Sequence, residues 1–259
     1  MRISYSKIYI IHHRQYRLEM SKINNLKHHI KSFVFEEKHF GAKKYHKSYS
    51  QCGEDLIVRF IFNQLKIDKP SYIDIGAHHP YIISNTAEFY LNGSKGVNIE
   101  PNPFYFKFFL EERPNDVNLN IGISENKQML EYYEFDEPAL NTFSEIEKNN
   151  LIKEGKSLQA SKKIHTHTLQ YVLDKFFKNK FPNFMSLDVE GYDMLVLNQI
   201  DYDNNFPVVI CVETISFSSS GNGAKNQEII NFLLSKGYFL HSDTYINSIF
   251  VRKAIWANK

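Results

Sequence analysis

Carboxylate and glycine residues end two short apolar runs, where they could bind a ligand that carries hydroxyl groups. Asp74 and Gly76 close the run Tyr72–Ile75, and Glu100 closes the run Lys95–Glu100. The Glu100 carboxylate, at the end of the second run, can accept two charge-assisted hydrogen bonds from the 2′- and 3′-hydroxyls of a ribose. Gly76 has no side chain, so the backbone there can come close to a ligand. The pattern indicates an adenosine-type ligand.

Three further carboxylates could carry chemistry. Asp188 and Glu190 follow the apolar run Phe184–Leu187, and Glu213 ends a later one. If strand geometry continues, Asp188 and Glu190 share one face. Either residue could act as a general base toward a hydroxyl group, or the pair with Glu213 could hold an oxygen-preferring Mg²⁺. Capping of the following helix is the alternative for Asp188.

Histidines offer a second kind of base. His78 and His79 follow Gly76 closely, so an imidazole there would lie beside the ligand turn, and His79 is a candidate catalytic residue. His165 and His167 alternate along an expected strand and share one face, where surface roles are favoured.

A parallel sheet is needed to bring these residues together. From Ser50 onward, short apolar runs alternate with helical patterns, which indicates an α/β fold with helices on both faces of the sheet. Five expected strands precede an antiparallel pair, Tyr238–His241 and Ile246–Arg252. In open α/β sheets, ligands bind beyond the carboxyl ends of the strands. The candidate carboxylates all fall at such ends. Asn120 and Ile121 also fall at one, after the third strand, where backbone amides could contact an adenine.

The turn after the first strand argues against a dinucleotide. A pyrophosphate cradle needs the glycines of G-x-G-x-x-G. The chain has Gly76-Ala77-His78-His79-Pro80-Tyr81 instead, with one glycine and a proline. S-adenosylmethionine has no phosphate and needs no cradle, so the turn favours this methyl donor.

Short motifs run through the chain in a fixed order. They are Ser50-Gln51-Cys52-Gly53-Glu54-Asp55, Asp74-Ile75-Gly76-Ala77-His78-His79-Pro80, Ser84-Asn85-Thr86, Lys95-Gly96-Val97-Asn98-Ile99-Glu100-Pro101-Asn102-Pro103 and Leu187-Asp188-Val189-Glu190-Gly191-Tyr192-Asp193. The series resembles the FkbM family of methyltransferases over roughly residues 48–252. The resemblance implies a class I (Rossmann-like) fold with a seven-stranded, mostly parallel sheet. It also implies S-adenosylmethionine-dependent O-methylation, often of sugar hydroxyls in glycans or glycosylated natural products.

The resemblance also implies a set of cofactor-binding residues. Asp74, Gly76 and Ala77 would form the turn at the methionine side, and Glu100 would hold the ribose. The remaining members would line or cover the pocket: Ser84, Asn85 and Thr86 from the first helix, and Gln51 and Glu54 from the segment before the first strand. For Gln51 and Glu54, a capping role at the start of a helix is an equal alternative.

The acceptor is the less defined half of the reaction. A carbohydrate or another hydroxyl-bearing acceptor is expected, with a small non-sugar acceptor as the alternative, because a fold does not fix its substrate. The segment Pro138–Lys163 is polar, and we expect an irregular insertion there that helps to select the acceptor.

Composition and charge divide the chain in two. Of its 259 residues, 42% are hydrophobic and 23% charged, which is a globular balance. Residues 1–49 hold 11 Lys and Arg against 3 Asp and Glu. We expect a basic, helical extension at 1–47, with helices near Ile8–Met20 and Lys22–Phe35, and a methyltransferase domain at 48–259. The extension could contact a second copy of the chain. Nucleic-acid binding is not favoured, since the basic residues are not interleaved with an aromatic pattern of the kind that stacks on single-stranded bases. A non-catalytic binding module that uses the basic arm is the rival class.

The compartment is a further expectation. No run of 18 apolar residues that could span a membrane occurs, and the start of the sequence lacks the small-residue cleavage site of a secretory signal. Cys52 and Cys211 lie far apart and lack metal-ligand spacing. A cytoplasmic location is therefore expected.

Overall fold

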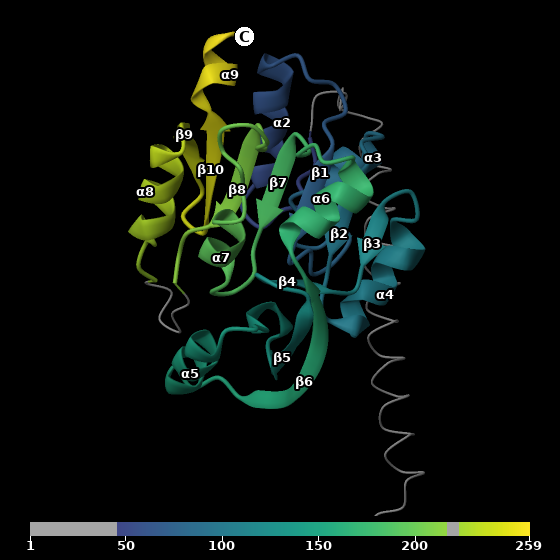
Figure 1. Ribbon diagram of the computed structural model, residues 1–259, viewed down its shortest axis with the longest axis vertical. Helices are drawn as coiled ribbons and strands as arrows, with labels where there is room; N and C mark the ends of the chain where they lie inside the picture. The colour runs from purple at the N-terminus through teal and green to yellow at the C-terminus, as the bar shows by residue number, and fades with distance from the viewer. Residues whose placement is uncertain (1–45, 217–222) are drawn as a thin grey trace, which may run out of the picture. The chain divides into compact units, whose positions relative to one another are not determined.

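A seven-stranded sheet forms the centre of the protein (Figure 1). The computed structural model describes residues 46–216 and 223–259. The strand order is β3-β2-β1-β7-β8-β10-β9, and β10 alone runs antiparallel to both of its neighbours among the described strands. The strands are β1 (Tyr72–Ile75), β2 (Gly96–Ile99), β3 (Val117–Leu119), β7 (Phe184–Leu187), β8 (Val209–Glu213), β9 (Tyr238–Asp243) and β10 (Asn247–Arg252). The predicted mostly parallel sheet with a closing antiparallel pair is confirmed.

Helices cover both faces of the sheet because successive strand residues point to opposite sides. Ile73 and Ile75 of β1 pack in one core with α6 (Leu169–Phe177), α7 (Asp193–Leu197) and α8 (Gln227–Ser235). Tyr72 packs on the other side with α2 (Glu54–Gln64) and α3 (Ala87–Leu91). The central strands are buried on both faces, which is why they read as continuous apolar runs.

Side-chain caps set several helix starts close to their predicted places. Asn102 accepts a hydrogen bond from the Phe104 amide at the start of α4 (Pro103–Glu112), and the first residue of that helix is proline. Thr168 and Asn226 cap α6 and α8 in the same way. Each cap satisfies an amide that has no partner within its helix. The short C-terminal helix α9 (Lys253–Ala257) was not expected.

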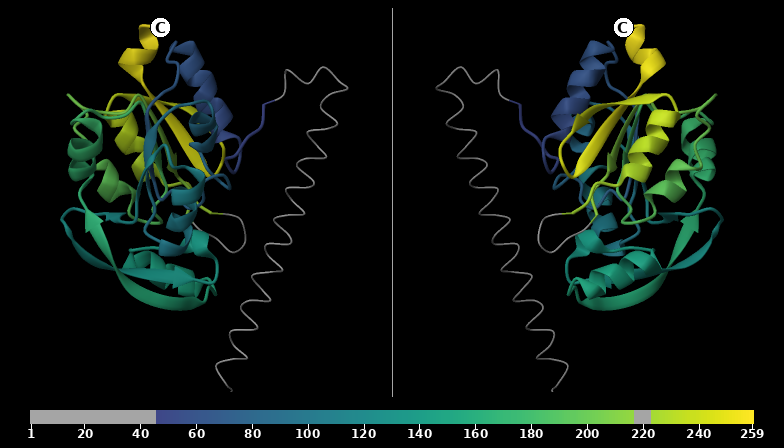
Figure 2. Two further views of the ribbon diagram at one scale, coloured as in Figure 1. Left: turned by 90° about the vertical axis from the view of Figure 1, so that its right-hand side faces the viewer. Right: turned by 90° about the vertical axis from the view of Figure 1, so that its left-hand side faces the viewer.

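A second, three-stranded sheet lies at the carboxyl ends of the central strands (Figures 1 and 2). Its order is β4-β6-β5, with β4 at Gly122–Ile123, β5 at Gln128–Phe135 and β6 at Leu158–His167. The short 3-10 helix η1 (Pro138–Leu140) and α5 (Glu145–Lys153) join β5 to β6.

The expectation of an irregular insertion at Pro138–Lys163 is wrong. That segment contains η1, α5 and the first part of β6. Most residues of β6 before Ile164 are exposed, and α5 buries only Leu151. Elements with so little buried surface need few apolar residues, so the periodic pattern that identifies a helix or strand is absent.

The predicted basic extension falls mainly outside the described residues, as do the helices expected near Ile8–Met20 and Lys22–Phe35. Its structure and a contact with a second copy stay predictions. Among the described residues, no helix has both the length and the apolar content to cross a bilayer.

Candidate active site

A cavity of about 400 Å³ opens at the carboxyl ends of the central strands. It lies where the strand order reverses, because β2 and β3 extend from β1 in one direction while β7 and β8 extend in the other. Such a switch point is the usual ligand site of an open α/β sheet. The volume lies within the range of small-molecule sites. Predicted residues on its wall are Gln51, Asp74, Gly76, Ala77, Asn85, Glu100, Asp188, Glu190 and Glu213.

Gly76 brings two strand ends into contact. Its φ is +81°, and a Cβ at this position would lie 1.7 Å from the Asp188 backbone oxygen. Only glycine allows this approach of the β1 turn to the end of β7. The Gly76 and Ala77 amides donate to the Ile99 oxygen, which fixes the turn against β2 as well. The glycine therefore closes the turn against protein backbone, a contact that its place in the sequence does not reveal.

Glu100 is held by the backbone on both of its carboxylate oxygens. Oε2 accepts from the His78 amide and Oε1 from the Asn102 amide, each at 2.7 Å. Burial raises the pKa of Glu100 to about 8, against the effect of these two bonds. Asn120 supports the same strand end, since its side chain donates to the Glu100 and Pro101 backbone oxygens. The carboxylate is thus fixed in orientation, with further lone pairs available for hydroxyl donors.

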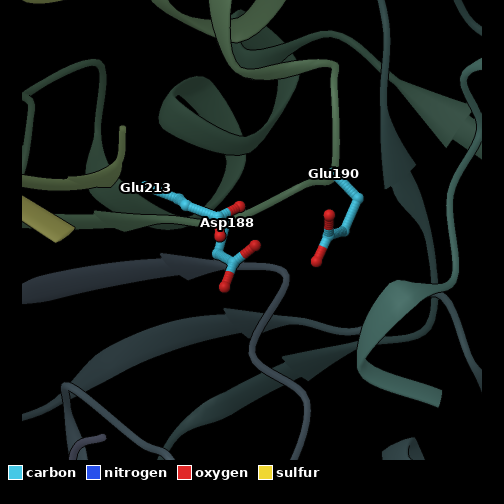
Figure 3. A group of neighbouring side chains, drawn as sticks. All are labelled: Asp188, Glu190 and Glu213. Carbon is cyan, nitrogen blue, oxygen red and sulfur yellow. The ribbon is translucent and has the colours of Figure 1, made fainter. Parts of the chain in front are cut away.

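Asp188, Glu190 and Glu213 form a carboxylate cluster, shown in Figure 3. One oxygen of each lies within 4.8 Å of those of the other two. Asp188 and Glu190 follow β7 and Glu213 ends β8, so the cluster exists because two parallel strands end side by side. Its oxygen donors are of the type that Mg²⁺ accepts.

Burial and mutual repulsion keep protons on this cluster. Asp188 is exposed to the cavity, yet protein surrounds it, and burial, then Asp193, then Asp74 raise its pKa to about 7. Burial and the other cluster members raise the pKa values of Glu190 and Glu213 well above the ordinary range. Asp188 can therefore change its charge near neutral pH.

The turn after β7 is strained and is fixed by the second sheet. Glu190 has a φ of +45°, a left-handed conformation that is uncommon for a residue with a side chain. The Thr142 hydroxyl, from the segment between η1 and α5, donates to the backbone oxygen of Glu190 at 2.6 Å. Gly191 follows with a φ of +89°, and a Cβ there would lie 3.3 Å from those of Glu147 and Ser144. The connection between β5 and β6 therefore positions the turn that carries Glu190.

Other predicted cofactor residues do not line the cavity among the residues that the structure describes. Glu54 is buried and accepts from Thr244, Asn247 and the Cys52 amide. The Thr86 hydroxyl donates to Asp74, and Thr86 directly precedes α3. Ser84, two residues earlier, is also buried. Ile121 packs against the main core.

His79 also lies outside the cavity wall. Its Nδ1 accepts from the Tyr81 and Ile82 amides, and burial lowers its pKa to about 4. The imidazole is therefore neutral at neutral pH, with one nitrogen already in use.

Several cavity residues were not expected from the sequence. Tyr105 of α4 packs against the predicted His78 in a tilted arrangement, with ring centroids 4.4 Å apart, and both line the cavity. Tyr132 and Phe143 line it from the second sheet and its connection, with ring centroids 4.8 Å apart. The aromatic run Phe104–Phe109 was a visible signal for Tyr105. Nothing local in the sequence marks the second pair, because its place depends on how the second sheet docks.

The sheet order, the switch-point cavity and the acidic strand ends define the class as a class I, Rossmann-like methyltransferase. The chain belongs to the FkbM methyltransferase domain family, whose profile matches residues 74–240. No curated protein sequence gives a significant match.

Solved structures similar to this chain include two methyltransferases. One is the Burkholderia thailandensis 1,6-didemethyltoxoflavin-N1-methyltransferase with bound 1,6-didemethyltoxoflavin and S-adenosylhomocysteine, at 7% identity, a TM-score of 0.40 and 88% coverage of each chain. The other is the precorrin-6y C5,15-methyltransferase of Geobacter metallireducens, at 11% identity and a TM-score of 0.33, covering 80% of this chain and 93% of that one.

Proposed function

We propose that this methyltransferase moves the methyl group of S-adenosylmethionine to a hydroxyl oxygen of a carbohydrate. The observation that carries the proposal is the carboxylate cluster at the ends of β7 and β8, in one cavity with the Glu100 carboxylate at the end of β2. In this proposal Glu100 binds the ribose of the donor, and the carboxylate cluster binds the acceptor hydroxyl.

The charges of the cavity support the choice of methyl donor. S-adenosylmethionine carries an ammonium and a sulfonium cation, and its sulfonium supplies an activated methyl group when bound. Asp74, Glu100 and Asp188 line the same cavity and can complement positive charge. Hydrogen bonds from ribose hydroxyls would favour the ionised form of Glu100, which burial otherwise disfavours.

Asp188 is the proposed general base. A sugar hydroxyl is a weak nucleophile, so its proton must leave during or after attack on the methyl carbon. A base with a pKa near the working pH removes a proton efficiently, and the pKa of Asp188 is about 7. With the donor bound, its methyl–sulfur bond would break as the new carbon–oxygen bond forms, so that the neutral thioether S-adenosylhomocysteine leaves. An Asp188 carboxylate oxygen would take the proton of the acceptor hydroxyl.

The carbohydrate acceptor is supported by the mixed lining of the cavity. Tyr105, Tyr132 and Phe143 supply aromatic rings, and Asn141 supplies a polar side chain. Aromatic faces can pack on the C–H groups of a sugar ring, while carboxylates and amides bond its hydroxyls.

A metal-assisted version has one observation in its favour, the close approach of the three cluster carboxylates. Asp188, Glu190 and Glu213 could together hold Mg²⁺ against two acceptor hydroxyls. Treatment with EDTA separates the two versions. The general-base version predicts unchanged activity, whereas the metal-assisted version predicts a loss that added Mg²⁺ restores.

The acceptor class is tested with a panel of nucleotide sugars, oligosaccharides and small phenols, each incubated with the full chain and S-adenosylmethionine. The proposal predicts a sugar product heavier by one CH₂ unit, with a methyl ether on oxygen. Methylation of the phenols alone, or of nitrogen, would contradict it.

A further inference from the structure

A buried arginine lies behind the cofactor turn. Arg113 directly follows α4 and is fully buried. It forms an ion pair at 2.9 Å with Asp116, and the Asp116 side chain is also fully buried. Its guanidinium also donates to the Tyr72 hydroxyl at 2.7 Å and to the Thr86 hydroxyl at 3.0 Å. A buried cation without hydrogen-bond partners is strongly unfavourable, so these contacts determine where the Arg113 side chain lies.

The guanidinium fixes the direction of both hydroxyls, because arginine can only donate hydrogen bonds. The Tyr72 hydroxyl accepts from Arg113 and donates to Asp116 at 2.6 Å. The Thr86 hydroxyl accepts from Arg113 and donates to Asp74 at 2.6 Å. Each hydroxyl thus accepts one hydrogen bond from the arginine and donates one to a carboxylate.

Asp74 is the member of this network that reaches the cavity. Its Oδ2 must be an acceptor, since the Thr86 proton points toward it. Ser186 also hydrogen-bonds to the carboxyl group. Burial raises the pKa of Asp74, while the Thr86 bond and the charge of Arg113 act in the opposite direction. The network therefore orients the Asp74 carboxyl group and opposes part of the rise in its pKa.

We infer that Arg113 and Thr86 are positioning residues that hold the Asp74 carboxyl group oriented toward the methionine ammonium of the cofactor. The inference rests on the proposed function, since it assumes that S-adenosylmethionine occupies the cavity. Arg113 also ties the turn to the rest of the sheet: it reaches Tyr72 in β1 and Asp116 just before β3.

The test compares two ligands with and without the methionine part. Calorimetry with the full chain measures Kd for S-adenosylhomocysteine, which has the ammonium, and for 5′-methylthioadenosine, which lacks it. Thr86→Val removes the hydroxyl and keeps the shape, and Thr86→Ser keeps the hydroxyl. Thr166→Val is the matched control, because Thr166 is buried and bonds Ser124 but does not line the cavity.

The inference predicts that Thr86→Val weakens S-adenosylhomocysteine binding about tenfold and 5′-methylthioadenosine binding less than about twofold. Thr86→Ser and Thr166→Val should bind like the wild type. An Arg113→Lys variant should repeat the selective loss, since lysine cannot bond Thr86, Tyr72 and Asp116 at once in the same geometry.

Equal weakening of both ligands by a folded Thr86→Val protein would overturn the inference, because it would show a general structural defect. Unchanged binding of both ligands would overturn it as well. Those outcomes leave the proposed function intact, since the wild type still binds. Failure of the wild-type protein to bind either ligand would instead refute the proposed cofactor, and the inference with it.

Discussion

Asp188 differs from its two neighbours in the carboxylate cluster. Its pKa of about 7 lets it be ionised for a useful fraction of the time at neutral pH. Burial and the neighbouring carboxylates raise the pKa values of Glu190 and Glu213 well above their ordinary range. Removing the titration of Asp188 while keeping its shape is therefore the sharpest test of a role in proton transfer.

Asp188→Asn should lower turnover at least about 100-fold, the usual contribution of a general base. Its Kd for S-adenosylhomocysteine should stay within about threefold of the wild type, since Glu100 and the backbone turn remain. Turnover of the wild type should rise with pH up to about 7, and the variant should lose that rise. The measurement uses single-turnover rates with a productive acceptor, and unchanged rates would remove Asp188 from the chemistry.

At the scale of residues, the sequence predicts which side chains lie at strand ends better than it predicts their hydrogen-bond partners. Asp74, Glu100 and Asp188 could be placed on the cavity wall because each lies at the end of an apolar run that predicts a buried strand. The partners of Glu54, Thr86 and Arg113 depend on distances between segments far apart in the chain. No local pattern encodes those distances, so the network behind Asp74 could not be predicted.

At the scale of elements, the turn between β1 and α3 depends on one glycine. Gly76→Ala should lower the free energy of unfolding by at least about 2 kcal/mol, because φ is +81° and the new Cβ would meet the Asp188 backbone oxygen. Gly155→Ala is the control, since Gly155 has a φ of +87° with no atom within 4 Å of its added Cβ. Urea denaturation measures both, and equal losses would show that the close approach costs nothing.

The second sheet shows where prediction by periodicity ends. The central strands and α6 could be predicted because they are buried on a regular pattern. The segment Pro138–Lys163 forms a helix and a strand with little buried surface. These elements derive their position from contacts such as Thr142 with Glu190, which link segments 48 residues apart.

At the scale of the whole molecule, the buried carboxyl groups make stability depend on pH. Burial and like charges raise the pKa values of Asp188, Asp193 and Glu100 to about 7, 6 and 8. Between about pH 6.5 and pH 8 these carboxyl groups therefore hold protons in the folded protein that the unfolded chain has released, whereas below about pH 6.5 the lowered pKa of His79 acts in the opposite direction. The free energy of unfolding should fall as pH rises through this window.

This dependence is measured by urea denaturation of the ligand-free protein at about pH 6.5 and about pH 8, where the histidines of the unfolded chain are mostly neutral. The midpoint should be lower at the higher pH, and Asp188→Asn should reduce the difference. Glu54 and Asp243 have lowered pKa values, so they change the free energy of unfolding only in more acidic solution. A midpoint that rises between the two pH values would show that the carboxyl groups are ionised in the folded state.

The central claim is that the cavity at the strand ends binds an adenosine-type methyl donor through Glu100. Calorimetric titration of the full chain with S-adenosylhomocysteine tests it most directly, with Glu100→Gln as the matched variant. The account predicts saturable binding to the wild type at one site per chain. It also predicts a loss of at least about tenfold in the variant, which keeps the shape but cannot accept two charge-assisted bonds. A folded wild-type protein that gives no heat of binding, or a variant that binds equally well, would contradict it.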